Sequence, residues 1–148
     1  MSKIYDGKQL PDVMHKWQHV LHLDAWDIRI KLCRQSEMLD PNVQGENNWT
    51  LATRQSVIHV LDPVDYPADT EFEQDMEQTV VHELLHLHFA PFEPEDDMGL
   101  AYLAMEQTIE LLARVLTGKN CDACSCKPDI EKIAHGIVEQ ITRAEISY

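Results

Sequence analysis

Five consecutive residues near the middle of the chain, His82-Glu83-Leu84-Leu85-His86, have the types and spacing of a metal-dependent hydrolytic site. On an α-helix, positions i and i+4 return to within about 40° of each other, so the two imidazoles can point at a single ion. Glu83 lies about 100° round the helix from His82, where it can lean over a water bound to that ion. This spacing is typical of a zinc-dependent hydrolase in which the glutamate is the general base.

The motif has two main alternative interpretations: exposed surface residues, or a pair of structural histidines whose hydrogen bonds are made within the protein. The residues around the motif help to decide between these and a metal site. Most neighbouring residues are apolar and predict a largely buried helix: Val80, Val81, Leu84, Leu85 and Leu87. Glutamate and histidine are poorly tolerated in buried positions unless they are paired or bind a metal, so the context favours a metal site. His88 falls on the opposite side of the helix from His86, and we interpret it as a core or surface histidine.

A zinc site needs a third protein ligand and an open position for water. The candidate ligand is Glu106, in the apolar segment 98–117, which also predicts a helix. Two antiparallel helices joined by a short loop would bring Glu106 beside His82 and His86. Glu110, one turn further on, is expected to accept a hydrogen bond from a ligand imidazole and fix its orientation. The alternative is a solvated pair of glutamates, although like charges at this spacing repel each other weakly.

The motif His82-Glu83-x-x-His86 followed by a helical glutamate resembles the gluzincin branch of the zincin metallopeptidases. In thermolysin-like members the third ligand's helix carries a second carboxylate four residues on, which matches Glu106 and Glu110. A strand containing Trp26, then H-E-L-L-H, then E-Q-x-x-E-x-x-A-R, is also similar to small metallopeptidases encoded by phages and prophages. Over about residues 9–117 the resemblance implies peptide-bond hydrolysis with one catalytic Zn²⁺, in which Glu83 transfers a proton from the attacking water to the leaving amine.

The chain also departs from that family. It lacks a second lobe of thermolysin's size, so the substrate cleft must be shallow or completed by a partner. For the histidine or tyrosine that stabilises the transition state, the candidate is Tyr102, one turn before Glu106. An extended peptide substrate is expected to add as a strand to an edge offered by residues 56–61.

The remaining patterns predict an α+β fold, with strands bunched before most of the helices. In chain order we expect a helix over 9–23, a strand over 26–33, a turn-rich loop over 40–48, strands over 49–54 and 56–61, a helix over 70–90 that Asp69 and Thr70 cap, a helix over 98–117 ending at Gly118, and a last helix from Pro128. This is a minimal zincin-like domain of residues 1–148, with an antiparallel or mixed sheet of about three strands.

Composition narrows the partners and the compartment. The 148 residues carry a net charge of −14, which argues against binding to nucleic-acid phosphates. No apolar stretch approaches the roughly 18 residues of a membrane span, and residues 1–6 have no signal-peptide core. We therefore expect a cytoplasmic protein that acts on a peptide or protein, without nucleic-acid or membrane partners.

Three cysteines are clustered near the C-terminus as Cys121-x-x-Cys124-x-Cys126. They could hold a second, structural zinc with Cys33 or a histidine as fourth ligand, or act as a redox pair. The plain alternative is a reduced surface loop, which is what a cytoplasmic location favours. The spacing does not decide between metal binding and a reduced loop.

Three functions are compatible with these features. The first is a zinc-dependent peptidase. The second is a catalytically weak or inactive protein-binding module that zinc stabilises; Glu83 argues against it, because a purely structural site has no use for a carboxylate beside the open coordination position. The third is an acidic inhibitor or decoy, which predicts no metal. We favour the peptidase.

Overall fold

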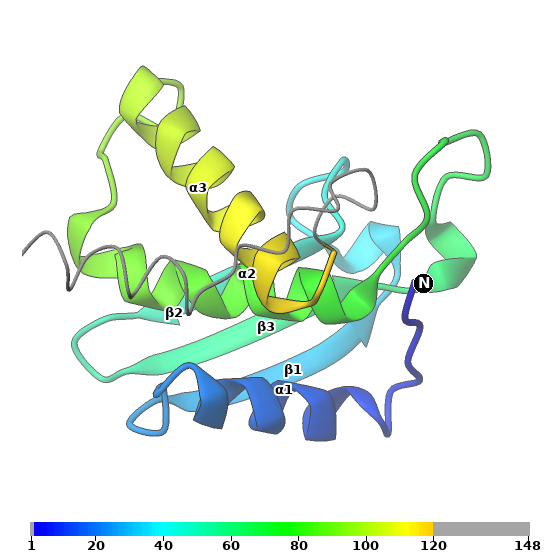
Figure 1. Cartoon of the computed structure of the whole chain (residues 1–148), viewed down its shortest axis with the longest axis horizontal. Coiled ribbons are helices and arrows are strands. Elements are labelled where there is room, and N and C mark those ends of the chain that lie inside the picture. The colour runs from blue at the N-terminus through cyan, green and yellow to red at the C-terminus, as the bar shows by residue number, and fades with distance from the viewer. Residues whose placement is uncertain (1, 120–148) are drawn as a thin grey trace, which may run out of the picture. The chain divides into compact units, whose positions relative to one another are not determined.

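The computed structural model describes residues 2–119, in which it shows three α-helices and three β-strands (Figure 1). In chain order they are α1 (Leu10–Val20), β1 (Asp27–Cys33), β2 (Gly45–Thr50), β3 (Gln55–Leu61), α2 (Met76–Phe89) and α3 (Leu100–Leu116), with short 3₁₀ helices at Gln35–Glu37, Pro63–Asp65 and Ala90–Phe92. Residues 1–118 form one compact unit, and residues 119–148 are a second. The clustered cysteines and the helix expected from Pro128 lie outside the described residues.

The three strands form one mixed sheet in the order β1-β3-β2. β1 pairs with β3 in parallel and β2 pairs with β3 antiparallel, so that Ile58 of β3 has Ile30 on one side and Asn47 on the other. This confirms an α+β fold with a small mixed sheet. The expected peptide-binding edge over 56–61 is wrong, because β3 is the central strand and both of its edges are paired. The outer strands of this sheet are β1 and β2.

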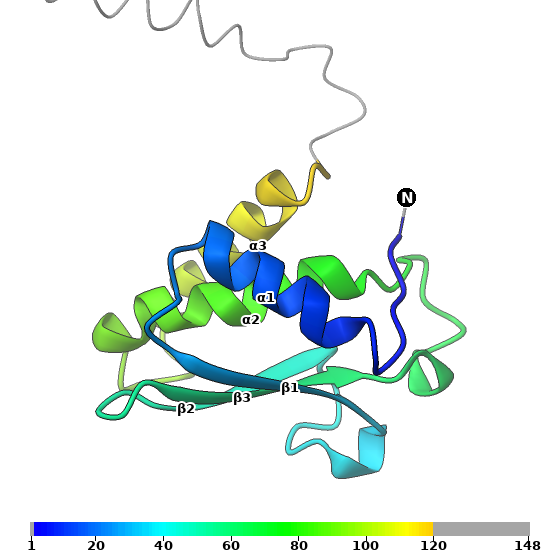
Figure 2. The ribbon, with the colours of Figure 1, turned by 90° about the horizontal axis from the view of Figure 1, so that it is seen from below.

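Helices α1 and α2 pack on the same face of the sheet, as Figure 2 shows. Their apolar side chains join those of the strands in one buried cluster, whose members include Leu10, Met14, Trp17, Ile28, Ile58, Val60, Val80, Val81 and Leu84. Each such side chain contributes about 1.5–3 kcal/mol when it is fully removed from water. Among the described residues, no helix is long and apolar enough to cross a membrane.

The second strand differs from the sequence prediction. Residues 45–48 were expected in a loop and 49–54 in a strand, but β2 begins at Gly45, ends at Thr50 and is followed by a turn. Arg54 ends that turn with a φ of 51°. Glu46, Asn47 and Asn48 have low strand propensity, yet their pairing with β3 and their side-chain partners outweigh it.

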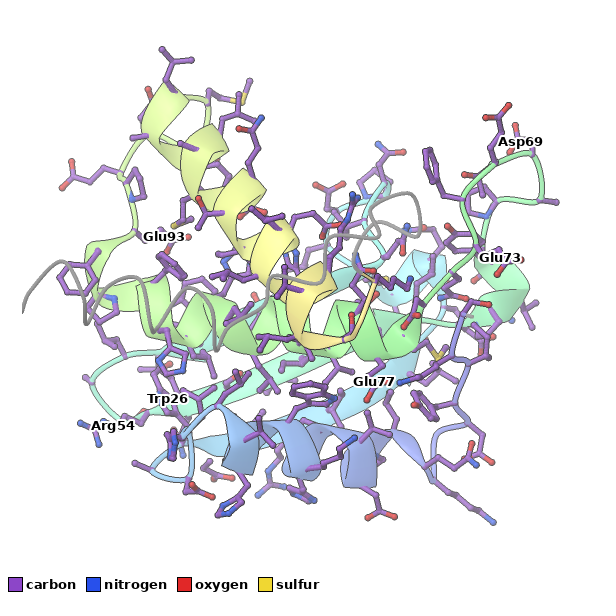
Figure 3. The ribbon with its side chains drawn as sticks, in the orientation of Figure 1. Trp26, Arg54, Asp69, Glu73, Glu77 and Glu93 are labelled. Carbon is purple, nitrogen blue, oxygen red and sulfur yellow. The ribbon has the colours of Figure 1, made fainter. Side chains whose placement is uncertain are left out.

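The start of α2 also differs from its prediction. The helix begins at Met76 rather than near residue 70, because Asp75 rather than Asp69 or Thr70 provides the cap. The Asp75 carboxylate accepts a hydrogen bond of 3.0 Å from the Gln78 N–H. Asp69 and Glu73 lie in the exposed loop before the helix (Figure 3). The end of α3 agrees with its prediction. Gly118 follows this helix with a φ of 80°, as expected of a residue just past a helix C-terminus.

A buried carboxylate joins the N-terminal segment and α1 to the first turn of α2. Glu77 is 2% exposed and accepts a hydrogen bond of 2.8 Å from the Trp17 indole N–H. It also forms ion pairs with Lys3 and Lys16. Burial raises the pKa of Glu77, but Lys3 and Trp17 outweigh burial and lower it. Figure 3 shows Glu77 on the side of α2 that faces α1.

We expect Glu77→Ala to lower the free energy of unfolding by about 2 kcal/mol, because the Trp17 N–H then loses its acceptor in a buried position. The folded-state pKa of Glu77 lies below the ordinary value of 4.5, so the stabilisation is complete above that pH and is lost as the pH falls through the folded-state pKa. Urea unfolding between pH 7 and pH 3 measures both effects. Exposed Glu73→Ala is the control, and an equal loss in the two variants would contradict this role.

Candidate metal centre

Two helices supply the residues of the site. The buried middle of α2 carries His82, Glu83 and His86, and α3 crosses it carrying Glu106 and Glu110 (Figure 1). One stripe of α3 is buried: Met105, Ile109 and Ala113. The two glutamates each follow a buried residue by one position, so packing that stripe brings them to the flank of α3 beside α2.

The structure brings the three expected ligands together. One donor atom from each of His82, His86 and Glu106 lies within 4.8 Å of the other two. The Glu106 carboxylate spans both rings, with Oε2 3.4 Å from His82 Nε2 and Oε1 3.3 Å from His86 Nε2. The two Nε2 atoms are 3.3 Å apart. Two imidazole nitrogens and a carboxylate oxygen therefore converge on one point.

One oxygen of this cluster lacks a hydrogen bond that a cation would replace. Glu106 Oε1 is buried, and its contact with His86 Nε2 is not a hydrogen bond. It is one of two buried side-chain atoms without a hydrogen bond among the described residues. A buried acceptor without a partner calls for an ion or an ordered water. Two imidazoles with one carboxylate are a donor set that zinc takes in catalytic sites, where three protein ligands leave one position open. His82, His86 and Glu106 are thus the residues that could hold zinc.

The charges of the two rings differ. Burial lowers the pKa of His82, but hydrogen bonds to Glu106 and Glu110 outweigh burial and raise it to about 10. For His86, burial and the positive charge of His82 lower the pKa, although Glu106 opposes them. His82 therefore takes up a proton more readily than His86 does. Because a metal takes neutral imidazoles, a metal bound here would displace a proton from His82.

Glu110 lies where the sequence places it, behind a ligand ring. Its Oε2 is 3.1 Å from His82 Nδ1, which leaves Nε2 of the same ring facing Glu106. Its Oε1 accepts hydrogen bonds from Gln78 and Arg114, at 2.7 and 2.9 Å. The hydrogen bond to His82 and the Arg114 charge outweigh partial burial and lower the pKa of Glu110 to about 2. Glu110 thus stays ionised and holds the His82 ring in one orientation.

Glu83 lies in the same turns of α2 but outside the cluster of three. Its side chain is buried, with the residue 6% exposed. Burial raises the pKa of Glu83 to about 7, the charges of Glu106 and Glu46 add to the rise, and His82 opposes it. A carboxylate with such a pKa exchanges protons readily near neutral pH, as a general base must.

Strand β2 supplies site residues that the sequence did not reveal. The Trp49 ring stacks on the His86 ring, with centroids 6.0 Å apart and planes inclined by 23°. The Asn47 amide donates a hydrogen bond of 2.8 Å to the backbone carbonyl of Glu83. The signal that could have revealed them is the alternation of Gly45, Asn47 and Trp49, which puts all three on one face of a strand.

Three other residues that the sequence analysis names lie in different environments. Tyr102 is partly buried beside Glu106, and burial together with the Glu106 charge raises its pKa to about 12, so it keeps its proton. His88 is exposed and outside the cluster, with Nε2 2.8 Å from the carbonyl oxygen of Leu21. Cys33, proposed for a cysteine–zinc site, is buried with Met38 and Leu61 in a small apolar cluster.

Comparison with known proteins does not extend this picture. No family model matches the chain, and neither a curated protein nor a solved structure matches it. The assignment of a function therefore depends on the residues and geometry of the site itself.

We expect Glu110→Gln to lower the affinity for zinc about 10–100-fold, as is usual when a carboxylate behind a ligand histidine is lost. Glutamine at this position keeps the size of the side chain but removes the charge that holds the His82 ring. Competition with a chromophoric chelator measures the affinity. Glu71→Gln, in the exposed loop before α2, makes the same charge change away from the site, and an equal fall in both variants would refute the orienting role.

Proposed function

We propose that the protein is a zinc-dependent peptidase, in which His82, His86 and Glu106 hold the ion and Glu83 is the general base. The observation that supports this most directly is the pairing of the converged donors with a separate buried carboxylate on the same helix. A structural zinc site uses its ligands alone, whereas a hydrolytic site also needs a base. The same residues favour a minimal zincin-like domain of the gluzincin type.

The residues of the site have distinct tasks in this proposal. When bound, zinc supplies a Lewis acid that polarises a carbonyl group and lowers the pKa of water towards about 7. Glu83 takes a proton from the attacking water and delivers it to the departing amine nitrogen, which a pKa of about 7 allows in both directions. Tyr102, protonated up to a pKa of about 12, can donate its O–H to the substrate's carbonyl oxygen.

An extended peptide could bind along β2 rather than along β3. Among residues 2–119, β2 is an outer strand of the sheet with one unpaired edge, and its Trp49 ring stacks on His86. Adding a strand there satisfies the backbone groups of both chains and lays a peptide beside the site. The substrate class we infer is therefore a peptide or an unfolded protein segment in extended conformation.

The second candidate is a protein-binding module that zinc stabilises and that has little or no catalytic activity. Exposed apolar side chains on α3 favour it, since large apolar patches often mark protein contacts: Leu100, Leu103, Leu111, Leu112, Val115 and Leu116. The buried carboxylate of Glu83 argues against it. Metal content and hydrolysis, measured on the same samples, separate the two candidates.

The metal content of the purified full chain tests the ligands. We expect about one zinc per chain in the wild type and a near-complete loss in His86→Ala and in Glu106→Ala, because two ligands hold zinc poorly. His88→Ala removes an exposed histidine from the same helix and is expected to keep the zinc. Elemental analysis gives the result. Zinc that persists in both ligand variants would place the metal elsewhere, and its absence from the wild type would favour an inhibitor or decoy.

Hydrolysis of fluorescently labelled casein tests the base. We expect Glu83→Gln to keep its zinc but to lose about 100-fold or more of the activity, the usual contribution of a general base. In the wild type, activity should rise with pH as Glu83 loses its proton, because the base must be deprotonated. Glu95→Gln, on an exposed loop, serves as the control. Full activity in Glu83→Gln would remove the residue from the mechanism.

A further inference from the structure

One face of the outer strand β2 lies against the helix that carries the site. Its alternate residues Gly45, Asn47 and Trp49 each meet α2 at a different point: Gly45 at the side chains of Thr79 and Glu83, Asn47 at the Glu83 carbonyl, and Trp49 at the His86 ring. Two of the three contacts are made to Glu83, which the proposed function identifies as the base. The strand therefore contacts both the backbone and the side chain of Glu83.

Position 45 needs a glycine because there is no room for a side chain, and not because of its backbone conformation. Its φ lies outside the left-handed region that favours glycine. A Cβ at this position would lie 2.5 Å from Thr79 Cγ2, 2.8 Å from Glu83 Oε1 and 3.2 Å from Glu83 Cγ. Thr79 cannot easily turn away, because its hydroxyl donates to the Asp75 carbonyl at 3.1 Å. The bare Cα of Gly45 thus forms one wall of the space that holds the Glu83 carboxylate.

Asn47 fixes the same helical turn through its backbone. The hydroxyl of buried Ser56 donates to Asn47 Oδ1 at 2.7 Å, which orients the amide so that Nδ2 donates to the Glu83 carbonyl at 2.8 Å. This chain of hydrogen bonds runs from β3 through β2 to α2. It sets the separation between the strand and the turn of α2 that bears Glu83.

We propose that Gly45 and Asn47 are positioning residues for Glu83, which hold its carboxylate in place for proton transfer without touching the metal donors. This inference rests on the proposed function. Displacement of a reacting group by about 1 Å can cost about 100-fold in rate. A methyl group at position 45 would displace the carboxylate while His82, His86 and Glu106 stay where they are.

The test uses the full-length chain. It distinguishes the contact that an added methyl group at position 45 makes with Thr79 from the contact that it makes with Glu83. Gly45→Ala alone clashes with both Thr79 and Glu83 and is expected to destabilise the fold. Thr79→Ser removes the methyl group at 2.5 Å and keeps the hydroxyl, so Gly45→Ala/Thr79→Ser leaves only the contact with Glu83. We expect this double variant to bind zinc as Thr79→Ser does, while its kcat on a labelled casein peptide falls by up to about 100-fold with KM within about twofold.

Asn47 offers an independent variant with a close control. Asn47→Ala removes the amide that holds the Glu83 carbonyl, whereas Asn48→Ala changes the next, exposed residue of the same strand. We expect kcat to fall in Asn47→Ala with zinc retained, and Asn48→Ala to match the wild type. A merely structural role would lower the melting temperature and the zinc content together, without a separate effect on kcat.

A measurement that does not need activity tests the contact itself. In the metal-free chain, we expect Gly45→Ala to lower the melting temperature less when Glu83 is already alanine, because one of its two clashes is gone. Equal losses in the two backgrounds, or full kcat in both Gly45→Ala/Thr79→Ser and Asn47→Ala, would overturn the positioning role and leave the peptidase proposal intact. A wild type that binds zinc but cleaves no peptide would overturn the proposed function and the positioning role with it.

Discussion

The cost of placing ionisable side chains in the apolar middle of α2 governs the rest of this structure. A charge moved from water into a protein interior loses several kcal/mol of solvation unless other groups replace the water. Helix α2 carries three such groups within five residues, His82, Glu83 and His86, and its own backbone cannot serve them. Compensation has to come from neighbouring elements, and for the two histidines it comes from the carboxylates of α3.

The compensation is graded. Glu110 is held by three donors and stays ionised, so it fixes one ring, whereas Glu106 retains a buried oxygen without a partner. Among the described residues, no hydrogen bond is donated to the Glu83 carboxylate. Burial therefore raises its pKa to about 7. Three glutamates within one small region thus have three different environments. This is the division that a site needs if one carboxylate orients, one ligates and one exchanges protons.

How much of this was predictable depends on whether a signal is local in sequence. The helical periodicity of α2 and α3 and the i, i+4 spacing of Glu106 and Glu110 are signals within short stretches of sequence. They were sufficient to predict that four side chains lie beside one another: His82, His86, Glu106 and Glu110. Asn47, Trp49 and Gln78 act through partners far away in sequence. The alternation of Gly45, Asn47 and Trp49 indicates a strand face, but it does not indicate which partners that face meets. The strand β2 was misplaced because Glu46, Asn47 and Asn48 resemble a loop in composition, and its pairing with β3 is a tertiary effect.

The division of His82, His86 and Glu106 between α2 and α3 has a consequence during synthesis. A nascent chain that has emerged only as far as α2 already carries both histidines and Glu83, but it lacks the carboxylate that lies between the two rings. The parallel pairing of β1 with β3 adds a second delay, since β1 must wait for β3, which follows β2 in the chain. The constellation can therefore assemble only after the ribosome has released α3. Such an order of synthesis keeps the cluster of His82, His86 and Glu106 incomplete until the elements that surround it have been made.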